Sequence, residues 1–217
     1  MAFEALKEKH RVLRENGPAD LNLRVHRALS WMARAGDVAG TDPDAAFIFY
    51  WISFNAAYAR DLEPDTSGQA RDDFARFFGQ LVALDAERRI FKAIWTQFPG
   101  PIRLLLTNKY AFAPFWKFVN GDRGYDNWEV RFRNSAVAVR DAFTRKDTPL
   151  LLSFLFDRLY VLRNQLVHGG ATWNSTVNRQ QVGDGVRILG VLMPIFAEIM
   201  MDNPAIDWGL PYYPVVK

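Results

Sequence analysis

Apolar residues recur every three or four positions along almost the whole chain, and this spacing limits the folds that the sequence can adopt. It is the period of an α-helix with one face in a core, whereas a half-buried strand would alternate apolar and polar residues. With 217 residues, 49% of them hydrophobic, the chain is long enough to bury a substantial core. The sequence therefore predicts an all-α fold, a bundle of seven to nine helices in one domain over residues 1–217.

Proline, glycine and capping residues mark where the predicted helices begin and end. The helix that opens at Asp42-Pro43-Asp44 carries aromatic residues at heptad-like spacing, which predicts one buried stripe: Phe47, Trp51, Phe54 and Tyr58. Residues 101–124 are predicted to be irregular with short helical turns, and residues 203–217 to form an extended C-terminal arm. The predicted helices span residues 3–16, 20–35, 43–62, 69–84, 85–98, 126–146, 149–168 and 176–201.

Composition excludes several classes of protein. The chain has no cysteine, which excludes disulfides, cysteine-type zinc sites and thiol nucleophiles. A net charge of +3 tolerates an RNA partner without requiring one. The sequence shows no signal peptide and no apolar run long enough to span a membrane, so we expect a cytoplasmic protein without a membrane partner. It contains no phosphate-binding glycine loop, zinc-binding helix or serine nucleophile motif, and we expect neither a metal nor a cofactor.

The predicted helix over residues 149–168 has the clearest boundaries. Thr148-Pro149 is a typical start, a hydroxyl cap followed by proline in the first turn. Gly169-Gly170 is a typical end, because glycine readily adopts the left-handed conformation that closes a helix. Helical geometry divides its side chains between two faces. Leu155, Leu159, Leu162 and Leu166 share one face, and Asp157, Val161, Asn164 and His168 share the other.

Three polar side chains near the end of this helix form a candidate catalytic group. Asn164 and His168 lie one helical turn apart, and the long stem of Arg163 can bring its guanidinium to the same side. A guanidinium matches the oxygens of a phosphate, and an imidazole can accept or donate a proton near neutral pH. Asn164 could orient the histidine or bind the substrate. Together Arg163, Asn164 and His168 could stabilise a phosphoryl group and move a proton without a metal.

The segment Arg163-Asn164-Gln165-Leu166-Val167-His168-Gly169 resembles the signature of the HEPN superfamily, an arginine followed by a polar residue and then a histidine. It is most similar to Apea-like and other stand-alone HEPN proteins, and residues 49–58 are similar to an early helix of those relatives. The position two residues after the histidine, a tyrosine in toxins paired with a nucleotidyltransferase antitoxin, is Gly170 here. Control by modification of that tyrosine is therefore not expected.

The resemblance implies a helical-bundle core that forms a homodimer through the motif helices. Two copies of Arg163, Asn164 and His168 would then line one cleft, where the RNA 2′-hydroxyl attacks the adjacent phosphate and leaves a 2′,3′-cyclic phosphate. It implies that Arg163 stabilises the developing charge, His168 shuttles the proton and Asn164 assists orientation. The expected function is a metal-independent endoribonuclease, as in a toxin or a phage-defence effector, with an antitoxin protein as a further partner.

Other residues are weaker candidates for substrate binding. Asn55 would lie at the edge of the active site of a HEPN protein, although a buried amide that is hydrogen-bonded is the simpler interpretation. Arg131, Arg133 and Arg140 belong to a basic stretch that continues to Lys146. That stretch is either a solvated helix face or a track of phosphate contacts leading RNA to the cleft.

Two other functions fit the same sequence. One is a non-catalytic HEPN module that binds RNA or a nucleotide, and the other is a structural or partner-binding helical bundle. His10 and His26 lie on separate predicted helices, without partners at metal-ligand spacing, and we expect surface or boundary positions for both.

Overall fold

The computed structural model describes residues 3–58, 69–211, 213 and 214, with the backbone alone for residues 69–73. Every regular element in these ranges is helical, which confirms the all-α prediction. Ten α-helices are described, more than the predicted seven to nine. They are α1 Phe3–Asn16, α2 Ala19–Val38, α3 Pro43–Tyr58, α4 Gln69–Leu84, α5 Arg89–Lys92, α6 Pro99–Leu106, α7 Ala113–Val119, α8 Trp128–Arg145, α9 Thr148–Val167 and α10 Arg179–Asp202.

The additional helices lie where the sequence predicts broken or irregular structure. The predicted helix 85–98 is a turn, the short helix α5 and a π-helix over Ala93–Gln97. Proline does not end a helix at Pro99 but begins α6 there, in the first turn, where its missing N–H is not needed. Residues 101–124 contain most of α6, a 3-10 turn over Lys109–Ala111, and α7. The end of the predicted helix 43–62 lies outside the described residues.

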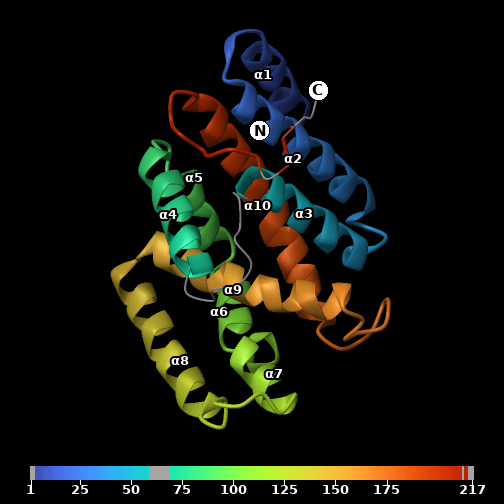
Figure 1. Ribbon diagram of the computed structural model, residues 1–217, viewed down its shortest axis with the longest axis vertical. Coiled ribbons are helices and arrows are strands. Elements are labelled where there is room, and N and C mark those ends of the chain that lie inside the picture. The colour runs from blue at the N-terminus through green and yellow to red at the C-terminus, as the bar shows by residue number, and fades with distance from the viewer. Residues whose placement is uncertain (1–2, 59–68, 212, 215–217) are drawn as a thin grey trace.

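The helices α1, α2, α3 and α10 pack against one another and form the four-helix layer at one end of the molecule (Figure 1). The predicted aromatic stripe of α3 is confirmed, because Phe47, Trp51, Phe54 and Tyr58 are all buried. The close approach of α10 to α3 requires a small residue on α10. A Cβ atom added at Gly185 would lie 2.4 Å from Cε2 of Phe47.

Helix α9 crosses the middle of the molecule and contacts helices on several sides, among them α3, α4, α6 and α8 (Figure 1). Its N-cap is Asp147 and not the predicted Thr148, since the Asp147 carboxylate accepts the N–H of Leu150 at 3.1 Å. The Thr148 hydroxyl is buried and accepts instead the indole N–H of Trp95 at 2.9 Å. The N-terminal end of this helix is thus fixed by a local hydrogen bond and by packing.

Helices α7 and α8 pack against each other at the opposite end of the molecule from α1 (Figure 1). Of the 18 residues of α8, only Val139 and Ala142 are buried, and no residue of α7 is buried. The α7–α8 pair therefore presents most of its surface to solvent. No helix in the described ranges is long and apolar enough to cross a membrane.

The described part of the predicted C-terminal arm contains no helix and lies against the four-helix layer. Trp208 is buried and meets the ring of Phe77 at a centroid distance of 6.3 Å. The guanidinium of Arg24, 1% exposed, donates to the carbonyl oxygens of Gly209 and Leu210. The predicted arm thus continues the fold, held by a buried arginine.

Candidate active site at the end of helix α9

Helix α9 ends at His168, its C-cap residue, as the two following glycines predict. Gly169 has a φ of 71°, the left-handed conformation expected there. The N–H of Gly170 donates to the carbonyl of Gln165 at 2.7 Å, and the N–H of Gly169 to that of Leu166 at 3.4 Å. This pair of bonds is the Schellman motif, which satisfies the last carbonyls of the helix and fixes the direction in which the chain leaves it.

The three predicted catalytic residues lie together at this end of the helix. The guanidinium Nη1 of Arg163 donates to the amide Oδ1 of Asn164 at 2.9 Å, with both side chains half-buried. His168 is exposed one turn further on, and its backbone N–H donates to the Asn164 carbonyl at 2.9 Å. Asn164 therefore contacts Arg163 through its side chain and His168 through its backbone.

The predicted division of α9 into two faces holds only in part. Leu155, Leu159 and Leu162 are buried as expected. Val161, predicted to share the polar face with His168, is also buried, at 6% exposed. The reason is that α9 has neighbours on several sides, so only its last turns reach the surface broadly.

Two exposed apolar side chains flank the Arg163–Asn164 pair. Tyr160 is 46% exposed and Val167 is 48% exposed, and both lie on the outer side of α9 near the motif. The ring of Tyr160 is 5.9 Å from that of Trp51 on α3. Asn55, the weak substrate-binding candidate, is half-buried one turn beyond Trp51 on the same face of α3. The structure therefore places Asn55 on α3, which packs against α9, and not hydrogen-bonded to Arg163 or His168.

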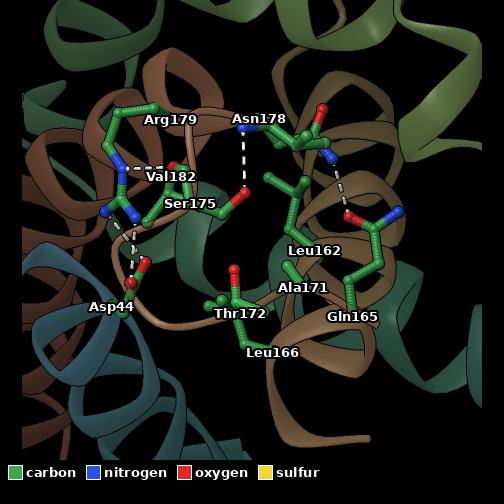
Figure 2. A pocket seen from close by; sticks show the side chains of 11 residues that line it. Asp44, Leu162, Gln165, Leu166, Ala171, Thr172, Ser175, Asn178, Arg179 and Val182 are labelled. Atoms are coloured by element: carbon green, nitrogen blue, oxygen red, sulfur yellow. Dashed lines mark hydrogen bonds and ion pairs between the residues drawn. The ribbon is translucent and has the colours of Figure 1, made fainter. Parts of the chain in front are cut away.

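The inner side of the same turn of α9 faces a small pocket (Figure 2). The side chain of Gln165 donates through Nε2 to the carbonyl of Tyr110 at 2.8 Å and accepts through Oε1 from Nδ2 of Asn178 at 2.9 Å. It thus joins α9 to two other segments. Arg163, Asn164 and His168 do not line this pocket, whose walls are Asp44, Leu162, Gln165, Leu166, Ala171, Thr172, Ser175, Val177, Asn178, Arg179 and Val182.

An ion pair closes the far side of the pocket and was not predicted. Arg179 and Asp44 form two parallel hydrogen bonds, Nη1 to Oδ1 and Nη2 to Oδ2, each 2.9 Å long (Figure 2). Asp44 is buried and also accepts the backbone N–H of Asn174 at 2.8 Å. The acid that the sequence assigns to the first turn of α3 therefore holds the segment between α9 and α10. Sequence spacing gives no signal for it, because its partners, Asn174 in the loop and Arg179 at the start of α10, are far away along the chain.

The basic candidates lie on α8, apart from the motif. Arg131, Arg133 and Arg140 are all exposed. Arg131 is engaged locally: its Nε donates to Oδ1 of Asn127 at 2.8 Å, and its Nη2 donates to the carbonyl of Gly124 at 3.0 Å. Helix α8 diverges from α9, with its N-terminal end beside α7 and away from the loop that follows α9 (Figure 1). The structure thus does not bring these arginines together with Arg163 and His168.

Among the described residues, no group of three or more His, Asp and Glu side chains is arranged to hold a metal ion.

Comparison with protein-family models, with curated proteins and with solved structures finds no match to this chain. The resemblance to HEPN proteins therefore rests on the segment 163–169 and on its position at the end of a helix in an all-α fold.

Proposed function

We propose that this protein is an RNA endonuclease that acts as a homodimer without a metal ion. The observation that carries the proposal is the geometry at the end of α9: a guanidinium oriented by Asn164, with an exposed imidazole one turn away. A guanidinium and an imidazole are sufficient to stabilise a pentavalent phosphate and to transfer a proton. His168 is exposed and Arg163 is half-buried, so both side chains reach the surface at this end of α9.

The proposed reaction is a transesterification within the RNA strand. The 2′-oxygen forms a bond to the adjacent phosphorus, and the bond from phosphorus to the 5′-oxygen of the next nucleotide breaks. His168 takes the proton of the 2′-hydroxyl, and a second imidazole, His168 of the other subunit, protonates the leaving oxygen. Arg163 stabilises the negative charge of the transition state, where its effect on rate is largest. The products are a 2′,3′-cyclic phosphate and a 5′-hydroxyl, and DNA is inert because it lacks the 2′-hydroxyl.

The exposed apolar residues beside the motif support the homodimer. Tyr160 and Val167 lie on the same outer side of α9 as the candidate site, where a second copy of α9 would cover them. We expect Val167→Glu to convert a dimer to a monomer and to remove cleavage, because the buried charge would be unpaired in the interface. Sedimentation velocity together with the cleavage assay tests this, and a monomeric parent protein that cleaves RNA would contradict it.

The decisive experiment is cleavage of a labelled RNA in EDTA, with analysis of the new ends. We expect His168→Ala to reduce the rate about 100-fold to 10,000-fold, the range for loss of a general acid–base group. Arg163→Lys should also cleave more slowly than the parent, because an ammonium cannot form the planar fork of a guanidinium. The matched controls are His26→Ala and Arg34→Ala on α2, which should cleave like the parent. No cleavage, or equal cleavage by the Arg163 and His168 variants, would refute the proposal.

A further inference from the structure

Helix α7 is aromatic, yet it contributes nothing to the core. Its seven residues include Phe115, Trp116 and Phe118, and none of the seven is buried. Large aromatic side chains normally supply much of the buried apolar area of a domain. Here Phe118 is 42% exposed, and Tyr110, just before the helix, is 45% exposed. Their rings therefore present apolar area to solvent.

These rings form a connected group, the aromatic platform, made of Tyr110, Phe115, Trp116, Phe118 and Trp128. The ring of Phe115 lies 5.5 Å from that of Tyr110 and 5.0 Å from that of Trp128, and Trp128 lies 6.2 Å from Phe118. The indole of Trp116 donates to the carbonyl of Tyr110 at 2.7 Å. Mutual contacts thus hold the rings in place without burying them.

The positive charge of the chain is concentrated in the segment that carries this platform and continues through α8. Residues 109–146 contain eight Lys and Arg against four Asp and Glu, a net charge of +4, whereas the whole chain has +3. The rest of the chain is therefore slightly negative. One of these cations lies on the platform itself, since Nζ of Lys109 is 5.1 Å from the ring centroid of Tyr110 and 5.6 Å from that of Phe115.

The platform also begins next to the candidate active site. The carbonyl of Tyr110 accepts a hydrogen bond from the side chain of Gln165, which directly follows Asn164 in α9. The start of the platform is therefore held against the last turns of α9. This contact is between the backbone of Tyr110 and Gln165, the neighbour of Asn164 in the sequence.

We propose that the aromatic platform binds single-stranded RNA, with bases stacked on Tyr110 and Phe118 and phosphates near Lys109 and Arg133. Stacking on aromatic rings beside a basic surface is the common means of binding single strands. The Lys109 ammonium lies directly over the rings of Tyr110 and Phe115, so cation and rings are within reach of the same stretch of ligand. This arrangement suits a nucleic-acid strand, in which bases and phosphates alternate. A membrane-binding surface would instead separate the two, with the rings inserted among the lipid chains and the cations at the headgroups. The choice of RNA over DNA rests on the proposed function.

The test is binding of a fluorescent, unstructured oligoribonucleotide that is 2′-O-methylated throughout, so that it cannot be cleaved by 2′-hydroxyl attack. The dissociation constant is measured by fluorescence anisotropy at several salt concentrations. The ring variant is Tyr110→Ala/Phe118→Ala, and the conservative variant that keeps both rings is Tyr110→Phe/Phe118→Tyr. The charge variant is Lys109→Gln/Arg133→Gln. The matched control is Trp31→Ala/Arg34→Gln, an exposed ring and cation on α2.

We expect the ring variant to bind at least about tenfold more weakly, consistent with the loss of base stacking, and the conservative variant to bind within about twofold of the parent. The charge variant should reduce the slope of log K against log salt concentration by about 1.4, since two phosphate contacts are lost and each contributes about 0.7 on a single strand. The control should bind like the parent. Circular dichroism verifies that each variant is folded. We expect all of them to fold, because every substituted side chain is exposed.

Three outcomes would overturn the inference: binding by the ring variant equal to the parent, equal weakening by the control, or tight binding to anionic phospholipid vesicles that the same ring substitutions remove. The last would make the platform a membrane-binding surface. Failure of the nuclease proposal is distinguishable, because the oligonucleotide would still bind to the platform while cleavable RNA remained intact. Conversely, cleavage by a ring variant with unchanged affinity would refute the platform alone.

Discussion

The four-helix layer and the α7–α8 pair use the same residue types in opposite ways. In the four-helix layer, charged side chains are buried and paired, as with Arg24, Asp44 and Glu198. In the α7–α8 pair and the segments that flank it, cations lie against aromatic rings near the surface, Lys109 over Tyr110 and Arg131 over Tyr125. A buried polar side chain must keep its partner for the fold to remain stable, because an unpaired buried group carries a desolvation penalty. Exposed side chains can change with little effect on folding and are free to serve a partner.

The largest difference between the two regions should appear on removing an arginine. Arg24 donates to the carbonyls of Ala57, Gly209 and Leu210, so Arg24→Met leaves these three acceptors, of which that of Ala57 is buried, without their donor. We expect the free energy of unfolding to fall by about 3 kcal/mol. The same change at exposed Arg133 on α8 should alter it by less than about 0.5 kcal/mol. Urea denaturation of both variants measures the contrast, and equal stability losses would refute it.

A smaller effect should follow from adding one methyl group to α10. At Gly185 the new Cβ would overlap Phe47 of α3, so Gly185→Ala should destabilise the protein by about 2 kcal/mol. At Gly183, two residues earlier in the same helix, no atom lies within 4 Å of the added Cβ. Gly183→Ala should therefore stabilise by about 0.5 to 1 kcal/mol through helix propensity. Thermal unfolding compares the two, and shifts of the same sign would contradict this account of the packing.

The smallest expected effect concerns pH and the buried histidine of the four-helix layer. Burial lowers the pKa of His10 below 6.5, although the hydrogen bond to the Asn22 carbonyl opposes this. The unfolded chain then binds more protons than the folded one, so stability rises with pH. The stability associated with neutral His10 should be fully present above pH 6.5, and the free energy of unfolding should fall as the pH is lowered below that value. His10→Gln should show a flatter dependence of unfolding free energy on pH between 7 and 5, and an unchanged dependence would exclude His10 as the cause.

Local signals in the sequence predicted the helices well, above all α9. Its predicted span, 149–168, differs by one residue at each end from the observed Thr148–Val167. The glycine that closes it has the expected left-handed conformation. Such signals succeed because a cap or a glycine acts within a few residues. The short helices α6 and α7 were predicted only as turns, since they are too short for a periodic pattern.

Contacts between distant segments could not be predicted in the same way. Nothing in the neighbourhood of Arg24 indicates that it is buried against the C-terminal arm, and nothing near Asp44 points to Arg179. His10 and His26, expected at surface or boundary positions, stack at 5.9 Å with His10 buried. At the candidate site, the spacing of Arg163, Asn164 and His168 predicts their shared position. The bond from Arg163 to Asn164 depends on side-chain conformation, which spacing leaves open.

The Asp44 carboxylate accepts hydrogen bonds from both Arg179 and the backbone of Asn174, and this has a mechanical consequence for His168. The backbone of His168 completes α9 through its own hydrogen bonds, and the loop after it is anchored on α3. Without this anchor, the loop would be free to rotate about Gly169 while α9 itself stayed helical. One carboxylate at the start of α3 therefore tethers the loop that leaves α9 directly after His168, through contacts more than 100 residues apart in the sequence.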